Sequence, residues 1–178
     1  IEPVQDHFKK KLKGMKYDEL IDLYMEMIQK KMPDMKSVIG FMGFSFGGEL
    51  SAALAAKYEE LYGERRLAIM GDTLARLESE YLDREMVESD LPEEALIGTK
   101  EKIESFLYRV NIINSFGYGK KYGCYDGEVT LLDARKGYSE EREKMKIHNA
   151  KMRWKNVKVI PMEDYTHTDL FRDLSMAD

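Results

Sequence analysis

The chain has 178 residues, of which 43% are hydrophobic and 34% are charged, with a formal net charge of -5. These values suit one globular domain with its own core, exclude a collagen-like, mucin-like or wholly disordered polymer, and argue against a general nucleic-acid binder. The one cysteine, Cys124, excludes an intramolecular disulfide and a cysteine-rich zinc module, and it favours a reducing, cytoplasmic setting.

The first predicted element is an amphipathic helix that ends before Pro33. Its apolar side chains recur at helical spacing: Tyr17, Leu20, Ile21, Tyr24 and Ile28. A near-continuous apolar run over residues 37–44 then predicts a strand buried on both sides in a parallel sheet. Residues 37–56 would be the one candidate membrane span, but four glycines interrupt them. We therefore interpret the stretch as strand, turn and helix, and expect no membrane partner.

Strands and helices continue to alternate along the chain. A helix with apolar residues at helical spacing precedes Gly63, a typical C-terminal cap, and residues 66–70 predict a second buried strand that ends at Asp72. The acidic and then helical stretch at about 74–121 is interpreted as an inserted lid.

The last part of the chain repeats the alternation. Residues 128–132 predict a third strand ending at Asp133, Ser139 opens a basic helix, and residues 157–160 form a fourth strand before Pro161. This order predicts the α/β class, with right-handed crossovers and a mostly parallel sheet.

One motif in the sequence indicates a catalytic site. Residues 43–48, Gly-Phe-Ser-Phe-Gly-Gly, match G-x-S-x-G between a predicted strand and a predicted helix, the context of a nucleophile elbow. Small neighbours at Gly43 and Gly47 would let strand and helix approach, so that Ser45 projects as a nucleophile and the N–H of Phe46 serves as the first oxyanion donor. The alternative is a glycine-rich packing turn with a buried serine.

A serine nucleophile needs a base and an orienting acid. The chain has 3 histidines, and His167 follows the last strand, so it emerges at the same edge of the sheet as Ser45. The acid has two candidates, because Asp72 and Asp133 each end a predicted strand. Strand position alone does not choose between them.

In this order of motifs the chain resembles the thioesterase domain of nonribosomal peptide and polyketide synthetases, and their free-standing type II relatives. That family has a G-x-S-F-G-G elbow, then a strand ending in the triad aspartate, a helical lid, another strand and a late histidine. The resemblance implies an α/β-hydrolase-like domain over residues 1–178, and it favours Asp72 over Asp133 as the acid of Ser45 and His167.

The resemblance also implies a reaction. A thioesterase of this kind takes an acyl or peptidyl chain from the phosphopantetheine arm of a carrier protein and releases it by hydrolysis or macrocyclisation. It needs no metal and no freely diffusing cofactor. Because such carriers are acidic, we expect docking at the basic segment 135–158, with Lys144, Lys146 and Lys151 exposed. The alternative is a solvated helix face without a partner.

One departure from the family matters. The family has several strands before the elbow, one of which supplies the second oxyanion donor, whereas this sequence offers one helix there and starts at Ile1. We therefore expect a C-terminal fragment whose strand at 38–44 pairs with a partner chain or, as a homodimer, with a second copy. A generic serine esterase and an inactive fragment that only binds or assembles are the alternatives to the thioesterase.

Overall fold

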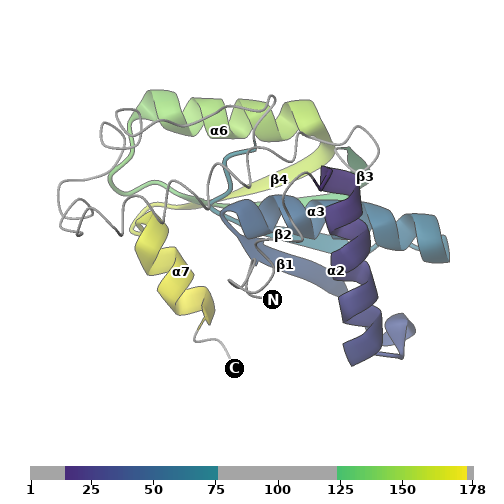
Figure 1. Cartoon of the computed structure of the whole chain (residues 1–178). Coiled ribbons are helices and arrows are strands. Elements are labelled where there is room, and N and C mark those ends of the chain that lie inside the picture. Colours follow the sequence, from purple (N-terminus) through teal and green to yellow (C-terminus); the bar gives the residue numbers. More distant parts are fainter. Residues whose placement is uncertain (1–14, 76–123, 176–178) are drawn as a thin grey trace. The chain divides into compact units, whose positions relative to one another are not determined.

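The structure, a computed structural model, describes residues 15–75 and 124–175 (Figure 1). From residue 18 onwards these belong to one compact unit. The predicted lid lies outside the described residues apart from its first two positions. The described elements are α2 (Tyr17–Lys31), the 3-10 turn η2 (Met35–Ser37), β1 (Gly40–Phe44), α3 (Phe46–Tyr62), β2 (Leu67–Gly71), β3 (Tyr125–Ala134), α6 (Glu140–Arg153), β4 (Trp154–Met162) and α7 (His167–Ser175).

The strands form one parallel sheet in the order β1-β2-β3-β4, so the predicted α/β class and parallel pairing are confirmed. Phe44 pairs with Gly71, Gly71 with Leu132, and Leu132 with Ile160. The carboxyl ends of β1 and β2 are therefore level, and β3 and β4 continue two residues further in the same direction. The residues that follow each strand therefore line up along one edge of the sheet, where open α/β sheets place their ligands.

The two faces of the sheet are covered by different helices. Phe41 and Phe44 are three positions apart on β1, so their side chains point to opposite faces. Phe41 packs on Tyr58 of α3 with ring centroids 6.0 Å apart, and Phe44 packs on Phe171 of α7 at 5.1 Å. Small side chains allow α3 to lie close to the sheet: Ala52, Ala53 and Ala55 are buried. Burial of such apolar surface supplies the main stabilisation, at about 25 cal/mol per Å².

The expectation that the first strand is buried on both sides is wrong. Ile39, just before β1, is 90% exposed and Met42 is 53% exposed. Among the described strands β1 pairs with β2 alone, so it forms an edge of the sheet. An apolar run in the sequence indicates a hydrophobic strand, but it does not indicate whether another strand lies beside it. The burial of this strand was therefore not predictable from the run alone.

Helix ends follow the local chemistry of the sequence. Gly63 caps α3 in the left-handed conformation, with φ of 70°. The Ser139 hydroxyl accepts the N–H of Arg142 at the start of α6, as its position predicted. The last helix, α7, was not predicted. Among the described residues no helix is long and apolar enough to cross a bilayer, and residues 37–56 contain the predicted strand, turn and helix in that order.

Candidate active site

Ser45 lies between β1 and α3 in an unusual backbone conformation, with φ of 54° and ψ of -124°. A positive φ is uncommon for a residue with a side chain and costs about 1–3 kcal/mol. The turn is possible because position 43 has no side chain: a Cβ on Gly43 would stand 1.8 Å from the carbonyl oxygen of Gly47. The G-x-S-x-G pattern therefore reflects a real close approach of strand and helix.

Gly47, the second glycine of the predicted pair, does not lie at a close contact. A Cβ on Gly47 would meet nothing within 4 Å, whereas one on Gly48 would stand 1.9 Å from Thr73 Oγ1. The expectation that position 47 requires a small residue is therefore wrong. The position that requires one is 48. The reason is that α3 crosses the end of β2 at Gly48, and a local motif carries no information about that long-range contact.

The turn at Ser45 is fastened to the end of β2. The Ser45 N–H donates to the carbonyl oxygen of Gly71 at 2.7 Å, and the Thr73 hydroxyl donates to the carbonyl oxygen of Ser45 at 2.9 Å. Asp72, between these two partners, also has a positive φ, of 41°. Two residues in rare conformations thus lie at neighbouring strand ends, and the residues on either side of Asp72 hold the backbone of Ser45 in place.

His167 contacts Asp72 directly. Its Nδ1 lies 2.6 Å from Asp72 Oδ2, which leaves Nε2 available for another partner. His167 is the first residue of α7 rather than part of a loop, and its ring lies on that of Phe44, with centroids 4.3 Å apart. The predicted base is therefore held next to the residue that precedes Ser45.

Ser45 and His167 are not joined by a hydrogen bond in the part of the chain that the structure describes. Catalytic hydrogen bonds between nucleophile and base are often long without substrate and tighten when it binds. The structure thus brings together the acid and the base of the predicted triad, and it places the serine at the adjacent strand end.

Asp72 is buried, with 4% of its surface exposed. Burial raises the pKa of its carboxyl group, but the hydrogen bonds from His167 and Lys146 lower the pKa more, so the net pKa lies below its ordinary value. Tyr138 donates a longer hydrogen bond, 3.3 Å, to Asp72 Oδ2. Burial and the charge of Asp72 raise the pKa of the Tyr138 hydroxyl to about 12. Asp72 is therefore ionised at neutral pH.

Asp133, the other candidate acid, is fully buried and has different partners. Lys146 Nζ lies 2.6 Å from its Oδ1, and Arg135 donates to its Oδ2 at 3.1 Å. The contact of His167 is thus with Asp72, the acid that the resemblance favoured.

Lys146 was expected to be exposed and to take part in docking, and this is wrong. Only 3% of its side chain is exposed, whereas 73% of the neighbouring Lys144 side chain is. The buried positions of α6 are Lys146, Ala150 and Arg153, a helical stripe with one apolar member. Hydrophobic periodicity does not reveal such a face. Spacing of four and three residues around Ala150 was the signal that could have revealed it.

The N–H of Phe46 begins α3, so it has no partner within its own helix. It lies next to Ser45 at the positive end of the helix, and its role as an oxyanion donor stays a prediction. Among the described residues no group of three or more His, Cys, Asp and Glu side chains could hold a metal ion.

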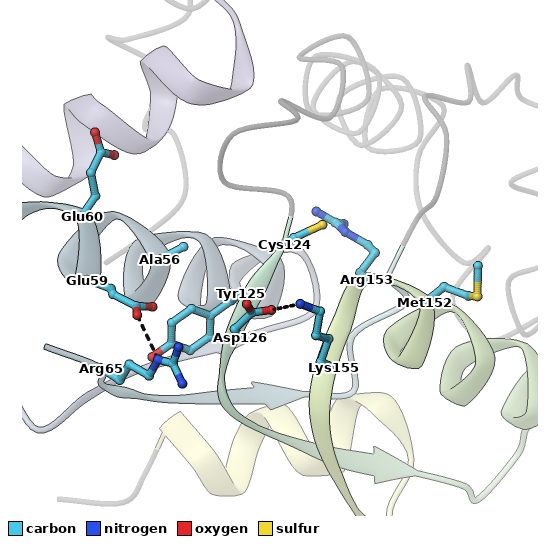
Figure 2. A pocket seen from close by; sticks show the side chains of 10 residues that line it. All are labelled: Ala56, Glu59, Glu60, Arg65, Cys124, Tyr125, Asp126, Met152, Arg153 and Lys155. Carbon is cyan, nitrogen blue, oxygen red and sulfur yellow. Dashed lines mark hydrogen bonds and ion pairs between the residues drawn. The ribbon is translucent and has the colours of Figure 1, made fainter. Parts of the chain in front are cut away.

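A pocket of about 670 Å³ lies elsewhere, at the amino-terminal ends of β3 and β4 (Figure 2). Ion pairs occupy its charged lining: Glu59 with Arg65 at 2.9 Å and Asp126 with Lys155 at 3.0 Å. Since Ser45 and Asp72 follow the carboxyl ends of parallel strands, this pocket is at the opposite end of the sheet and does not belong to the candidate site.

No protein-family model matches the sequence, and no curated protein does. Several solved structures are similar to this chain. The NocB thioesterase domain, in covalent complex with a fluorophosphonate nocardicin G analogue, is similar with a TM-score of 0.57 and 19% identity, over 92% of this chain and 70% of that one. Human thioesterase 2 has a TM-score of 0.58 and 15% identity, over 86% of this chain and 73% of that one. An esterase from Pyrococcus furiosus has a TM-score of 0.51 and 17% identity, over 91% of this chain and 58% of that one.

These likenesses show the fold. The fold of the described residues is similar to that of these α/β hydrolases, thioesterase domains among them. The predicted fold class and the resemblance are both confirmed.

Proposed function

We propose that the chain is a serine hydrolase of the thioesterase type, which releases an acyl or peptidyl chain from the phosphopantetheine arm of a carrier protein by hydrolysis or macrocyclisation. The single observation that supports this most is the 2.6 Å contact of His167 Nδ1 with buried Asp72, next to the Ser45 elbow. The likeness to the NocB thioesterase domain supports the choice of substrate class.

In the proposed reaction Ser45 Oγ attacks the thioester carbonyl carbon while His167 Nε2 takes the hydroxyl proton. Asp72 holds the imidazole at Nδ1 and stabilises its charged form. The developing oxyanion accepts the N–H of Phe46, and loss of one such donor typically costs 10²–10³ in kcat. The C–S bond then breaks, and His167 returns the proton to the leaving thiol.

The acyl-enzyme is resolved by a second nucleophile. Water attack gives a free acid, and attack by an amine or hydroxyl of the acyl chain itself gives a ring; His167 removes the proton in either case. No resident cofactor takes part, since the pantetheine belongs to the substrate. We infer a cytoplasmic setting for this chemistry from the single cysteine of the chain.

The proposed carrier docks on the outer surface of α6. With Lys146 buried, the exposed cations of this helix are Lys144 and Lys151. An acidic partner would be attracted by them at low ionic strength, and exposed charge pairs contribute little individually. Substituting Glu for both residues should slow the carrier reaction and reduce its dependence on salt, without slowing turnover of a small ester.

A generic serine esterase is the second candidate, favoured by the likeness to the Pyrococcus furiosus enzyme. It would use the same Ser45, Asp72 and His167. Comparing a carrier-bound acyl thioester with the same acyl group on a small alcohol separates the two. Preference for the carrier supports the thioesterase, and turnover of the small ester with no response to the carrier supports the esterase.

A fluorophosphonate probe tests the shared part of both proposals. We expect labelling confined to Ser45, which Ser45→Ala abolishes and His167→Ala reduces strongly, since the hydroxyl is then without its base. Circular dichroism and thermal unfolding of each variant control for folding. A folded protein that the probe does not label would contradict both enzymatic proposals and favour a chain that only binds or assembles.

A further inference from the structure

Lys146 reaches the candidate site from α6 and is almost completely enclosed. Its side chain is 3% exposed, and its ammonium group has three donors to satisfy. Asp72 Oδ1 lies at 2.5 Å, Asp133 Oδ1 at 2.6 Å and the carbonyl oxygen of Ala134 at 2.9 Å. Two of these contacts are hydrogen bonds, to Asp72 and to Ala134. The contact with Asp133 Oδ1 is an ion pair, and this buried oxygen accepts no hydrogen bond from the described residues.

Each of the four carboxylate oxygens has a cationic or hydrogen-bonding neighbour. Lys146 contacts one oxygen of each acid, while Arg135 donates to the second oxygen of Asp133. The second oxygen of Asp72 contacts His167 at 2.6 Å and also accepts the longer hydrogen bond from Tyr138. A carboxylate fixed at one oxygen has little freedom to rotate, so the direction of the other oxygen is set as well.

The arrangement also balances charge. Asp72 and Asp133 are both buried, and their oxygens share one nitrogen, so the two carboxylates lie near each other. Two buried carboxylates at close range disfavour each other's ionisation unless a cation lies between them. Lys146 is that cation.

We propose that Lys146 is a positioning residue of the active site: it turns one oxygen of Asp72 toward His167 and places a positive charge between the two buried aspartates. The inference rests on the proposed function, because Asp72 matters to a reaction only if His167 is its base. Lys146 itself touches no reacting atom.

Several titratable or charged groups surround this cluster, and any pH effect belongs to all of them. They come from the strand ends, the loop before α6, α6 itself, the loop after β4 and α7: Asp72, Asp133, Arg135, Tyr138, Arg142, Glu143, Lys146, Glu163 and His167.

The test compares Lys146→Met with Asp133→Asn. Loss of the buried cation leaves an excess of negative charge beside His167, which favours an added proton on the imidazole or on the pair of aspartates. Both effects move the acid limb of kcat/KM to higher pH, by about one unit or more. Loss of the Asp133 charge leaves an excess of positive charge and should move the limb to lower pH. If Lys146 and Asp133 only stabilised the fold, the two variants would not shift the acid limb of kcat/KM in opposite directions.

The double variant Lys146→Met/Asp133→Asn restores the charge balance and should return the limb toward its original position. The matched control is Arg153→Met, which removes another buried cation of α6, one that is paired with Glu49 at 2.9 Å and lies at the other end of the helix. Its acid limb should not move. The ring resonances of His167, titrated by NMR, should follow the same pattern in all four variants.

The NMR titration needs no turnover, so it separates this inference from the proposed function. If Ser45 is not labelled but the His167 titration shifts as described, the function fails and the inference about the cluster holds. If activity is intact and neither titration nor acid limb shifts, Lys146 has no positioning role. If Lys146→Met does not fold but the double variant does, the charge balance is supported, and if neither folds the residue serves the fold and the proposal is overturned.

Discussion

Asp72 accepts hydrogen bonds from His167 and Lys146 on different oxygens, and this distinguishes it from Asp133. In the sequence both residues come at the end of an apolar run, so they were equivalent candidates, although Asp133 lies within β3 and Asp72 follows β2. The difference between them arises from side chains that are distant in sequence, on α6 and α7. Such long-range partners are what a motif does not encode, and the family resemblance supplied the preference instead.

Asp72→Asn should lower kcat by about 10⁴, because an amide in this position favours the wrong tautomer of His167. Asp133→Asn should cost far less, since the contact between Asp72 and His167 remains. Steady-state kinetics on an activated ester measures both variants, with thermal unfolding as the control for folding. An equal or larger loss in Asp133→Asn would identify Asp133 as the acid and contradict the assignment.

Stability should also report the charge of Asp72. Its pKa is lowered in the folded state from an ordinary value of 3.8, so the unfolded chain binds the proton first as the solution becomes acidic. The carboxylate therefore contributes stability at neutral pH, and this contribution is lost as pH falls from 3.8 through the lowered pKa. The difference in free energy of unfolding between the wild type and Asp72→Asn should shrink over this range. Denaturant titrations at several pH values measure it, and a difference that stays constant would contradict the expected shift.

The elements of the site differ in how well the sequence predicts them. The elbow was predictable because its cause is local: Ser45 needs a positive φ, and Gly43 must allow the helix to pass close by. The start of α7 carried a local signal as well. Thr166 and Asp169 form a reciprocal cap, in which the Thr166 hydroxyl accepts the N–H of Asp169 at 3.1 Å and Asp169 accepts the N–H of Thr166 at 3.3 Å. The spacing T-x-x-D is typical of a capping box, and it places His167 in the first turn of a helix.

The elbow glycines provide a matched pair of variants. Gly43→Ala puts a methyl group 1.8 Å from the backbone oxygen of Gly47, which has no flexible side chain to move aside. We expect loss of Ser45 labelling and a destabilisation of several kcal/mol or failure to fold. Gly47→Ala meets nothing within 4 Å and lies in a helix, so its stability should be unchanged or higher by up to about 1 kcal/mol. Similar thermal unfolding of the two variants would show that the turn is not as tight as described.

At the scale of the whole molecule, the alternation of strands and helices was enough to predict a parallel sheet, because right-handed crossovers leave few alternatives. The environment of β1 was not predictable in the same way. Burial depends on what lies beside a strand, and the apolar run at 37–44 is compatible with a central strand and with an edge that another chain covers. In the described sheet the strand order places β1 at the edge, and Ile39 and Met42 are 90% and 53% exposed there.

An exposed apolar edge strand is a template for pairing with another chain, so we expect β1 to associate with a second copy. Sedimentation should show a dimer whose amide protons over residues 40–44 exchange more slowly as protein concentration rises. Met42→Lys should shift the equilibrium to monomer, because charged side chains on an edge strand suppress pairing. Lys144→Met changes an exposed charge on α6, away from β1, and should leave the dimer intact. A monomer at all concentrations, with fast exchange across 40–44, would show that the exposed edge is tolerated without a second copy.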